Sequence, residues 1–391
     1  MIPRALGARS AILLAIPALL FIALWPVARP IEGSGDTFQF WYAGHLVATG
    51  GSAYDQQAWH AAGAAYGPVA ANVARNCADP GAAVCVWAYP PLTAWLFAPF
   101  GALPPEIGLL GLNVFVVLSA IGGVAAAVLV FGPADSASRA LLVATAVVAH
   151  PFVFDIRAGH FVGLLLLGVS LVASGLRTGT TLPIVVGALV LALKPHVVLV
   201  VGLAVLVVLV SRRAWRGIAI TGGSLFVVAG IALALSPEAI GAMAGRSGPK
   251  AAIAWATVWA FPAPVAVAVV AAGVAVAVVA LRAVGGPVPV PVTATVAVAG
   301  ALSLVVAPYA QPYDLLLALP VLALIWRIAA DLSSAARRRV TAGASALFAA
   351  GTWAAIFAGQ LSPALESAYA LVPLSELALL ALAARLRRAT A

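Results

Sequence analysis

Four groups of polar and ionisable residues in this largely apolar sequence call for explanation. Asp36 follows the first long apolar stretch and lies in residues 35–44 (GDTFQFWYAG). The other groups are Asp155, Arg157 and His160; Lys194 and His196; and Tyr309, Gln311, Tyr313 and Asp314. A carboxylate can take a proton from a hydroxyl group, and Lys, Arg or protonated His can hold a departing anion. These residue types therefore suit proton transfer beside an anionic group.

Each group also has an ordinary structural explanation. Asp155 and Arg157 could simply pair with each other. Lys194 could reach along its helix to the membrane interface. Asp314 could be a first-turn carboxylate favoured by the helix dipole, or it could orient a substrate hydroxyl or a nearby cation. For Lys194 we favour anion binding, because Pro195 breaks the helix beside it and frees backbone polar groups.

The composition is that of a membrane protein. Of the 391 residues, 64% are hydrophobic and only 8% are charged, and the mean hydropathy is +1.10. A soluble core of this length could not bury so much apolar surface. The apolar runs have the length of membrane-crossing helices, whereas a β-barrel would show shorter, alternating segments. We expect an all-α polytopic protein, with residues 1–391 forming a single integral membrane domain.

The apolar segments predict about twelve crossings, once tilt and burial in the protein are allowed. We place them at residues 10–28, 107–131, 139–153, 160–176, 180–193, 195–211, 216–235, 262–283, 289–306, 312–329, 340–359 and 369–386. The run from Leu92 to Leu103 is short and bounded by prolines, so we expect a re-entrant or interfacial segment there. Residues 29–91 then form the first extracytoplasmic loop.

The distribution of Lys and Arg predicts the orientation in the cell membrane. With Arg4 and Arg9 inside, most arginines fall in cytoplasmic loops, so we expect both termini in the cytoplasm. All five histidines and most carboxylates then lie near the extracytoplasmic face. The net charge of +9 reflects this topology and does not indicate nucleic-acid binding. Membrane lipids are expected partners, and a nucleic acid is not.

The first extracytoplasmic loop contains a short amphipathic helix with Phe38, Tyr42 and Leu46 at helical spacing. It also contains the chain's two cysteines, Cys77 and Cys85. In an oxidising compartment we favour a disulfide between them, with two free thiols as the alternative. No suitable His pattern accompanies them, so a zinc site is weakly supported.

Several short motifs, taken in order, resemble the membrane glycosyltransferases of family 87 (DUF2029) in the GT-C superfamily. This is the polyprenol-phosphate-mannose-dependent mannosyltransferase type. The motifs are Asp36 to Gly44 with Tyr54-Asp55; residues 87–92 (WAYPPL) with 97–100 (FAPF) and Leu103-Pro104; Gly159-His160; residues 193–196 (LKPH); and Pro308-Tyr309 to Tyr313-Asp314. The resemblance extends over most of the chain.

The resemblance implies a GT-C-like bundle with an extracytoplasmic active site. It implies an inverting glycosyltransferase that moves a sugar, with mannose expected, from a polyprenyl-phosphate donor to a lipid or glycan acceptor. Asp36 would be the general base, and Lys194 with Arg157 or His160 would hold the donor phosphate. The further expected substrate contacts are Tyr42, Tyr89, His196, Tyr309, Gln311 and Asp314. No cofactor is expected, because the donor carries its own phosphate, and a divalent metal is left unassigned.

Three other readings stay open at this point. The enzyme could transfer another sugar, such as arabinofuranose. A transporter or flippase for a lipid-linked sugar would need a similar cavity with cations. A structural membrane protein without activity would need Asp36 and Lys194 only for folding. The substitution Asp36→Asn separates these classes, because only an enzyme should lose product while the protein is made normally.

Overall fold

The computed structural model of the protein describes residues 36–70, 73, 87–244, 262–285, 290–307, 310–361 and 369–390. Every regular element within these ranges is a helix. The expected crossing at 10–28, the two cysteines Cys77 and Cys85, and Tyr309 lie outside the described residues. The prediction of an all-helical protein is confirmed for the described part of the chain.

The first described elements are short. They are α2 (Thr37–Ala48), α3 (Gln56–Tyr66), the 3₁₀ turn η1 (Gly67–Ala70) and α5 (Pro91–Gly101). The amphipathic helix expected around Phe38 is α2, and the short apolar run after Pro91 is α5. Asp55 starts α3, because its Oδ1 accepts hydrogen bonds from the backbone N–H groups of Gln57 and Ala58. Pro91 starts α5 from the first helical position, where no N–H group is needed.

The other described α-helices are between 6 and 27 residues long. They are α6 (Pro105–Phe131), α7 (Ser136–Val148), α8 (His150–Ala158), α9 (Val162–Thr178), α10 (Thr181–Leu191), α11 (Leu199–Ser211), α12 (Trp215–Leu235), α13 (Ala239–Ala244), α14 (Ala263–Gly285), α15 (Val292–Val306), α16 (Leu319–Ala329), α17 (Ser334–Ala346), α18 (Thr352–Leu361) and α19 (Leu371–Thr390). Three shorter turns interrupt them: η2 (Pro195–Val197), η5 (Pro312–Ala318) and the π-helical η6 (Leu347–Gly351).

Among the described residues, five helical stretches are long and apolar enough to cross a membrane. They are Pro105–Phe131, Trp215–Leu235, Ala263–Gly285, Pro312–Ala329 and Ser334–Ala358. A sixth span results if α7 and α8, which meet at an angle of 55°, are counted as one. The shorter apolar helices are α9, α10, α11 and α15. The structure is thus consistent with a membrane protein, and it does not confirm the predicted number of about twelve crossings.

The expected crossing at 139–153 is a broken helix. It divides at Ala149 into α7 and α8. Trp353 compensates for the break, because its Nε1–H donates to the carbonyl oxygen of Val148 at 3.0 Å. The break directs α8 differently from α7, and α8 carries Asp155 toward the polar groups described below.

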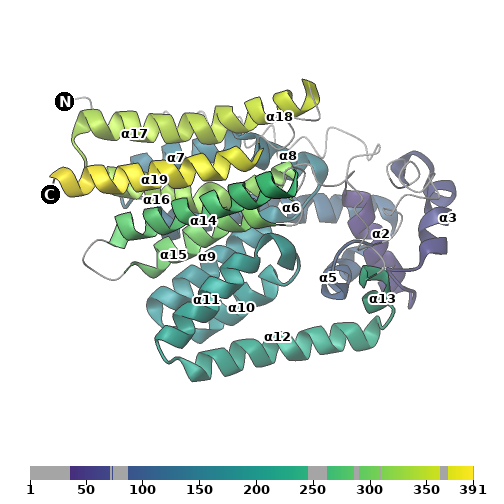
Figure 1. The fold of residues 1–391 in the computed structure, drawn as a ribbon. Helices are drawn as coiled ribbons and strands as arrows, with labels where there is room; N and C mark the ends of the chain where they lie inside the picture. The colour runs from purple at the N-terminus through teal and green to yellow at the C-terminus, as the bar shows by residue number, and fades with distance from the viewer. Residues whose placement is uncertain are drawn as a thin grey trace.

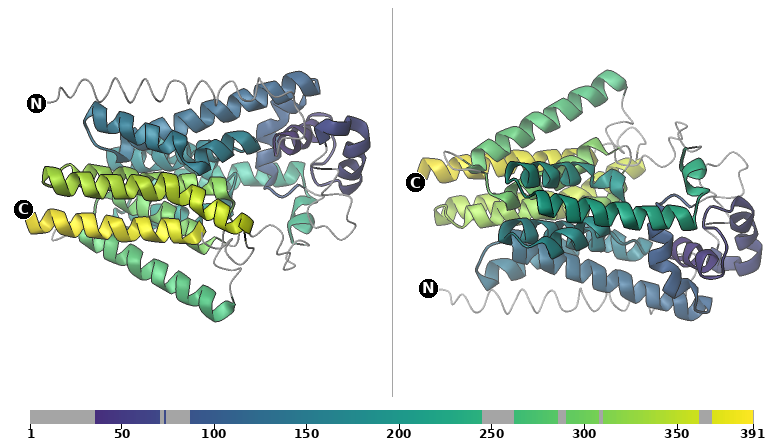
Figure 2. Two further views of the ribbon diagram at one scale, coloured as in Figure 1. Left: turned by 90° about the horizontal axis from the view of Figure 1, so that it is seen from above. Right: turned by 90° about the horizontal axis from the view of Figure 1, so that it is seen from below.

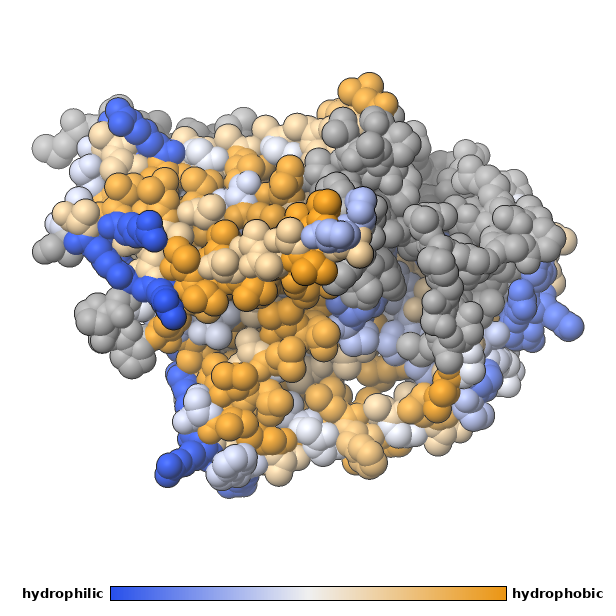
Figure 3. Space-filling model, in the orientation of Figure 1, coloured by the Kyte–Doolittle hydropathy of each residue, from blue (hydrophilic) through white to orange (hydrophobic). Residues whose placement is uncertain are grey.

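The helices form an elongated bundle with α2, α3, α5 and α13 gathered at one end (Figures 1 and 2). The described C-terminus lies at the opposite end. Contacts there confirm that several helices end together: Arg337 at the start of α17 donates to Ser138 Oγ of α7 at 2.9 Å, and Arg387 of α19 pairs with Asp331 at 3.8 Å. Hydrophobic residues cover the middle of the bundle, and hydrophilic residues gather at this arginine-rich end (Figure 3).

The α2–α5 contact fixes the position of α2 at its end of the bundle. The two helices approach so closely that a Cβ atom on Gly101 would overlap the backbone of Gly44 and His45. The Nδ1 atom of His45 lies 3.0 Å from the Gly101 carbonyl oxygen. Small residues allow such close backbone contact, and here the contact fixes the C-terminal half of α2 against α5.

Candidate functional site

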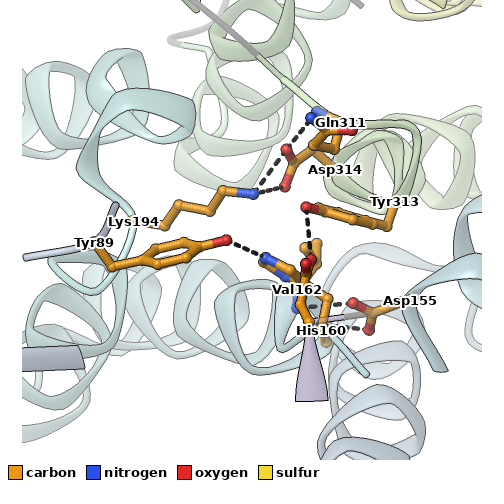
Figure 4. Close-up of polar contacts among 10 residues, drawn as sticks. Tyr89, Asp155, His160, Val162, Lys194, Gln311, Tyr313 and Asp314 are labelled. Carbon is orange, nitrogen blue, oxygen red and sulfur yellow. Dashed lines mark hydrogen bonds and ion pairs between the residues drawn. The ribbon is translucent and has the colours of Figure 1, made fainter. Parts of the chain in front are cut away.

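Four interruptions of the helices converge at one place in the bundle, and Figure 4 shows the residues from three of them, His160, Lys194 and Asp314. Asp36 is the N-cap residue of α2, and His160 follows the end of α8. Lys194 precedes the turn η2, and Asp314 lies in the turn η5. Together with Tyr89 and Tyr313, these residues are called the polar cluster below. In membrane proteins, irregular backbone is tolerated where it is buried in protein or lines a cavity.

Lys194 and Asp314 form a fully buried ion pair. The Nζ atom of Lys194 lies 2.7 Å from Oδ1 and 2.9 Å from Oδ2 of Asp314, and the two side chains are 1% and 0% exposed. Oδ2 also accepts the backbone N–H of Gln311 at 2.8 Å. The backbone next to Lys194 is also fixed, because Thr93 Oγ1 donates a hydrogen bond to the carbonyl oxygen of Leu193 at 2.9 Å. Extension of Lys194 to the membrane interface is therefore wrong.

His160 is fully buried and joins two aromatic residues. Its Nε2 atom lies 2.8 Å from the hydroxyl oxygen of Tyr89. Its ring stacks on that of Tyr313, with centroids 4.0 Å apart and planes inclined by 19°. Tyr89 is held in turn by Tyr54, whose hydroxyl donates to the Tyr89 carbonyl oxygen at 2.7 Å. The imidazole is thus fixed in place by both its edge and its face.

Tyr313 connects the ion pair to Asp36. Its hydroxyl donates to Oδ2 of Asp36 over 3.5 Å, which is a long hydrogen bond. The Nζ atom of Lys194 lies 4.8 Å from the centroid of its ring, within the range of a cation–π contact. These contacts join residues that are 277 positions apart in the chain.

Asp36 is less buried than the other two carboxylate residues nearby. Asp155 and Asp314 are fully buried, whereas Asp36 is partly exposed. Burial raises the pKa of the Asp36 carboxyl to about 6, while the Lys194 ammonium and the Tyr313 hydroxyl oppose this rise and the Asp314 carboxylate adds to it. A carboxyl with a pKa near neutrality is suited to accept a proton from a hydroxyl group.

Gly159 allows the α8–α9 turn to lie against the first turn of α2. Its backbone has the left-handed conformation, with φ 71°. A Cβ atom at this position would overlap the hydroxyl of Thr37, the residue after Asp36. The same contact is completed by a hydrogen bond from the Asp36 N–H to the Ala158 carbonyl at 2.7 Å. Both the conformation and the close approach thus require glycine.

Asp155 has a structural role instead of pairing with Arg157. Its Oδ1 accepts the backbone N–H of Val162 at 3.0 Å, and its Oδ2 accepts that of Gly163 at 3.1 Å. These are N–H groups of the first turn of α9, which no intrahelical partner can satisfy. Arg157 is exposed. The alternative of an Asp155–Arg157 pair is therefore wrong, and Asp155 anchors the turn that carries His160.

The structure brings together most of the residues predicted as a site. Asp36, Tyr89, His160, Lys194 and Asp314 are members of the polar cluster, and Gln311 joins it through its backbone N–H. His196 is partly exposed in η2, two residues after Lys194.

Two predicted site residues lie apart from the cluster. No hydrogen bond or ion pair joins Arg157 to it among the described residues. The Tyr42 hydroxyl donates to the Ala58 carbonyl at 2.9 Å, and the Tyr42 ring packs against Phe38 and Trp59. Tyr42 thus belongs to the aromatic contact between α2 and α3.

Sequence reasoning named Tyr313 in one of the four polar groups without giving it a role in the site, and it did not name Thr93. Tyr313 stands between Pro312 and Asp314 at a helix interruption, and this position was a usable signal. Thr93 gave none, because it acts through the carbonyl oxygen of a residue 100 positions away. Within the described ranges, no group of three or more His, Cys, Asp or Glu residues is placed to hold a metal ion.

Comparisons of this chain with protein-family models, with curated proteins and with solved structures each gave no match.

Proposed function

We propose that the protein is an inverting glycosyltransferase of the cell membrane with a GT-C-like bundle of about twelve crossings. It transfers a sugar, mannose in the first instance, from a polyprenyl-phosphate donor to the hydroxyl group of a lipid or glycan acceptor. The arginine-rich end of the bundle lies in the cytoplasm, as the positive-inside rule requires, and the polar cluster lies toward the extracytoplasmic side.

One observation carries this proposal: Asp36, a residue of intermediate exposure, places its carboxyl beside an otherwise buried cluster of polar groups. A general base must reach its substrate and must have a pKa near the working pH. Burial raises the pKa of the Asp36 carboxyl to about 6, which meets the second condition, and Asp36 is less buried than Asp155 and Asp314. The buried Asp155 and Asp314 are already occupied with backbone and ammonium partners.

In the reaction, the acceptor oxygen attacks the anomeric carbon of the sugar while Asp36 takes the hydroxyl proton. The new bond joins the acceptor oxygen to the anomeric carbon, and the bond from that carbon to the phosphate oxygen breaks. The electron pair leaves with the polyprenyl phosphate, and attack from the opposite side inverts the anomeric configuration. No nucleotide takes part, because the leaving phosphate is already attached to the lipid.

Lys194 supports the departing phosphate in this scheme. An ammonium group has three N–H donors, and Asp314 takes up two of them. In the proposed reaction, the third donor binds a phosphate oxygen of the polyprenyl phosphate. The ion pair holds the Lys194 ammonium in a fixed direction, so the charge does not need to reorient during the reaction. Such preorganisation stabilises the negative charge that develops on the departing phosphate.

A transporter for a lipid-linked sugar is the second candidate, and one observation favours it. The polar cluster is built where several helices are interrupted, and transporters form substrate sites from discontinuous helices in this way. A transporter would move the lipid-linked sugar across the membrane without breaking the bond to phosphate.

The test is sugar transfer in liposomes that contain the purified protein, radiolabelled polyprenyl-phosphate mannose and a panel of glycolipid acceptors. We expect wild type to form labelled glycolipid and folded Asp36→Asn to form almost none. Asp331→Asn is the matched control, because Asp331 is exposed at the arginine-rich end and should not affect transfer. Equal transfer by wild type and Asp36→Asn would refute the assignment of the base. Movement of the intact donor without transfer would favour the transporter.

A further inference from the structure

Tyr313 lies beside the Lys194–Asp314 ion pair (Figure 4), and its hydroxyl donates to the Asp36 carboxyl. The proposed reaction assigns it no step. It is 5% exposed, so the environment of its side chain is set by the protein.

Several neighbours determine where the Tyr313 hydroxyl can point. One is His160, with stacked rings 4.0 Å apart, and another is Phe154, with ring centroids 5.7 Å apart and planes inclined by 24°. Its chain neighbour Asp314 is held by the Lys194 ammonium. With the ring and the backbone both fixed, the hydroxyl oxygen has a defined position relative to Asp36.

The Asp36 carboxyl has little else to orient it. Its backbone N–H is bound to the Ala158 carbonyl, but this does not fix rotation of the side chain. Within the described part of the chain, the one hydrogen bond to its carboxylate comes from Tyr313 and goes to Oδ2. The other oxygen, Oδ1, has no such donor there. The charged groups that act on this carboxyl are the Lys194 ammonium and the Asp314 carboxylate.

We propose that Tyr313 is a positioning residue for Asp36. Its hydroxyl holds Oδ2, so that Oδ1 faces the acceptor hydroxyl, and its stacked ring ties this orientation to the Lys194–Asp314 pair. The inference rests on the proposed function for its catalytic meaning. It also makes a claim about the carboxyl itself that can be tested without any enzymatic activity.

The variant Tyr313→Phe removes the hydroxyl and keeps the ring that stacks on His160. A hydrogen-bond donor stabilises the ionised carboxylate, so its loss should make Asp36 harder to ionise. The pH at which Asp36 is half protonated should rise by up to about one unit. A residue that serves only for packing would leave this pH unchanged.

A hydrophobic carbodiimide reports protonation directly, because it reacts with protonated carboxyls within membrane proteins. The modified Asp36 is quantified by mass spectrometry of its peptide over a range of pH. We expect labelling of wild type to fall as the pH rises through about 6, and labelling of Tyr313→Phe to fall at higher pH. Tyr369→Phe is the matched control, because the Tyr369 hydroxyl is buried and makes no hydrogen bond with the described residues.

A second measurement covers the case in which Tyr313→Phe does not fold. Replacement of all tyrosines by 3-fluorotyrosine makes each phenol a stronger donor with almost no change in shape. The labelling curve of Asp36 should then move to lower pH. If neither replacement moves the curve, the inference is overturned.

Failure of this inference can be told apart from failure of the proposed function. A shifted labelling curve in a protein without transferase activity would leave Tyr313 as a positioning residue and would reject the glycosyltransferase. The role of Tyr313 alone would be rejected if the protein has transferase activity but Tyr313→Phe shifts neither the labelling curve of Asp36 nor the acid limb of the pH–rate profile.

Discussion

The buried ion pair of Lys194 and Asp314 gives the sharpest prediction about stability. We consider Lys194→Met, which keeps an unbranched side chain of similar length without its charge, and Asp314→Asn. Each single change leaves one buried group without its ionic partner. The third variant combines both changes and leaves no charge at either position.

The magnitude follows from the geometry of the pair. At oxygen–nitrogen distances of 2.7 and 2.9 Å, the attraction is about 6 kcal/mol for an effective dielectric constant of about 20. Removal of the charges also relieves their desolvation, so part of this attraction is offset. Loss of one partner from a buried pair destabilises proteins by about 3–5 kcal/mol, and we expect this loss in free energy of unfolding for each single variant.

The double variant should recover most of that loss. Replacement of a buried pair by uncharged groups is often neutral, because no uncompensated charge is left. The side-chain amide that Asp314→Asn introduces keeps a carbonyl oxygen that can accept the Gln311 N–H, so the turn η5 retains its hydrogen bond. We therefore expect the double variant to lie within about 2 kcal/mol of wild type.

The assay is reversible unfolding of the purified protein in mixed detergent micelles, followed by circular dichroism. Asp331→Asn is the control, because its partner Arg387 is 3.8 Å away and the two side chains are 63% and 34% exposed. Loss of this surface pair should cost at most about 1 kcal/mol. If the double variant is destabilised by the sum of the two single losses, the two groups do not compensate each other and the reasoning is refuted.

Three further predictions concern the pH dependence of transfer and the fit of single residues. The rate of sugar transfer should fall about tenfold per pH unit below the Asp36 pKa of about 6 and stay constant above it, because the base acts in its ionised form. A rate that does not change with pH would contradict this prediction. Gly159→Ala should lower the free energy of unfolding by about 1–3 kcal/mol, because φ is 71° and the new Cβ would overlap Thr37; an unchanged unfolding curve would show that the turn can relax. Glu376→Leu should raise the free energy of unfolding by about 1–3 kcal/mol in the same assay, because the Glu376 carboxyl is fully buried on α19 without a hydrogen-bond partner among the described residues. A lower free energy of unfolding would contradict this and would mean that the carboxyl makes a stabilising interaction.

The helices could be placed from the sequence because their signals are local. The apolar segment expected at 107–131 is α6, the one expected at 216–235 is α12, and the one expected at 262–283 is α14. Proline and glycine mark many of the boundaries, as Pro91 does for α5. The break at Ala149 was not predicted, because the apolar run continues through it and the compensating Trp353 comes from 205 positions further along the chain.

The sequence alone determined that this is an apolar, helical chain and that four small groups of ionisable residues occur at interruptions of its apolar segments. Composition, run length and proline positions are properties of neighbouring residues, and they can be read without a fold. Which ionisable groups meet was decided by the tertiary structure. Lys194 pairs with Asp314 across 120 positions, and Asp36 receives the hydroxyl of Tyr313 across 277. Arg157, only two residues from Asp155, remains exposed. Such choices depend on how whole helices pack, because burial and distance set the strength of each charge interaction, and no local pattern contains either quantity.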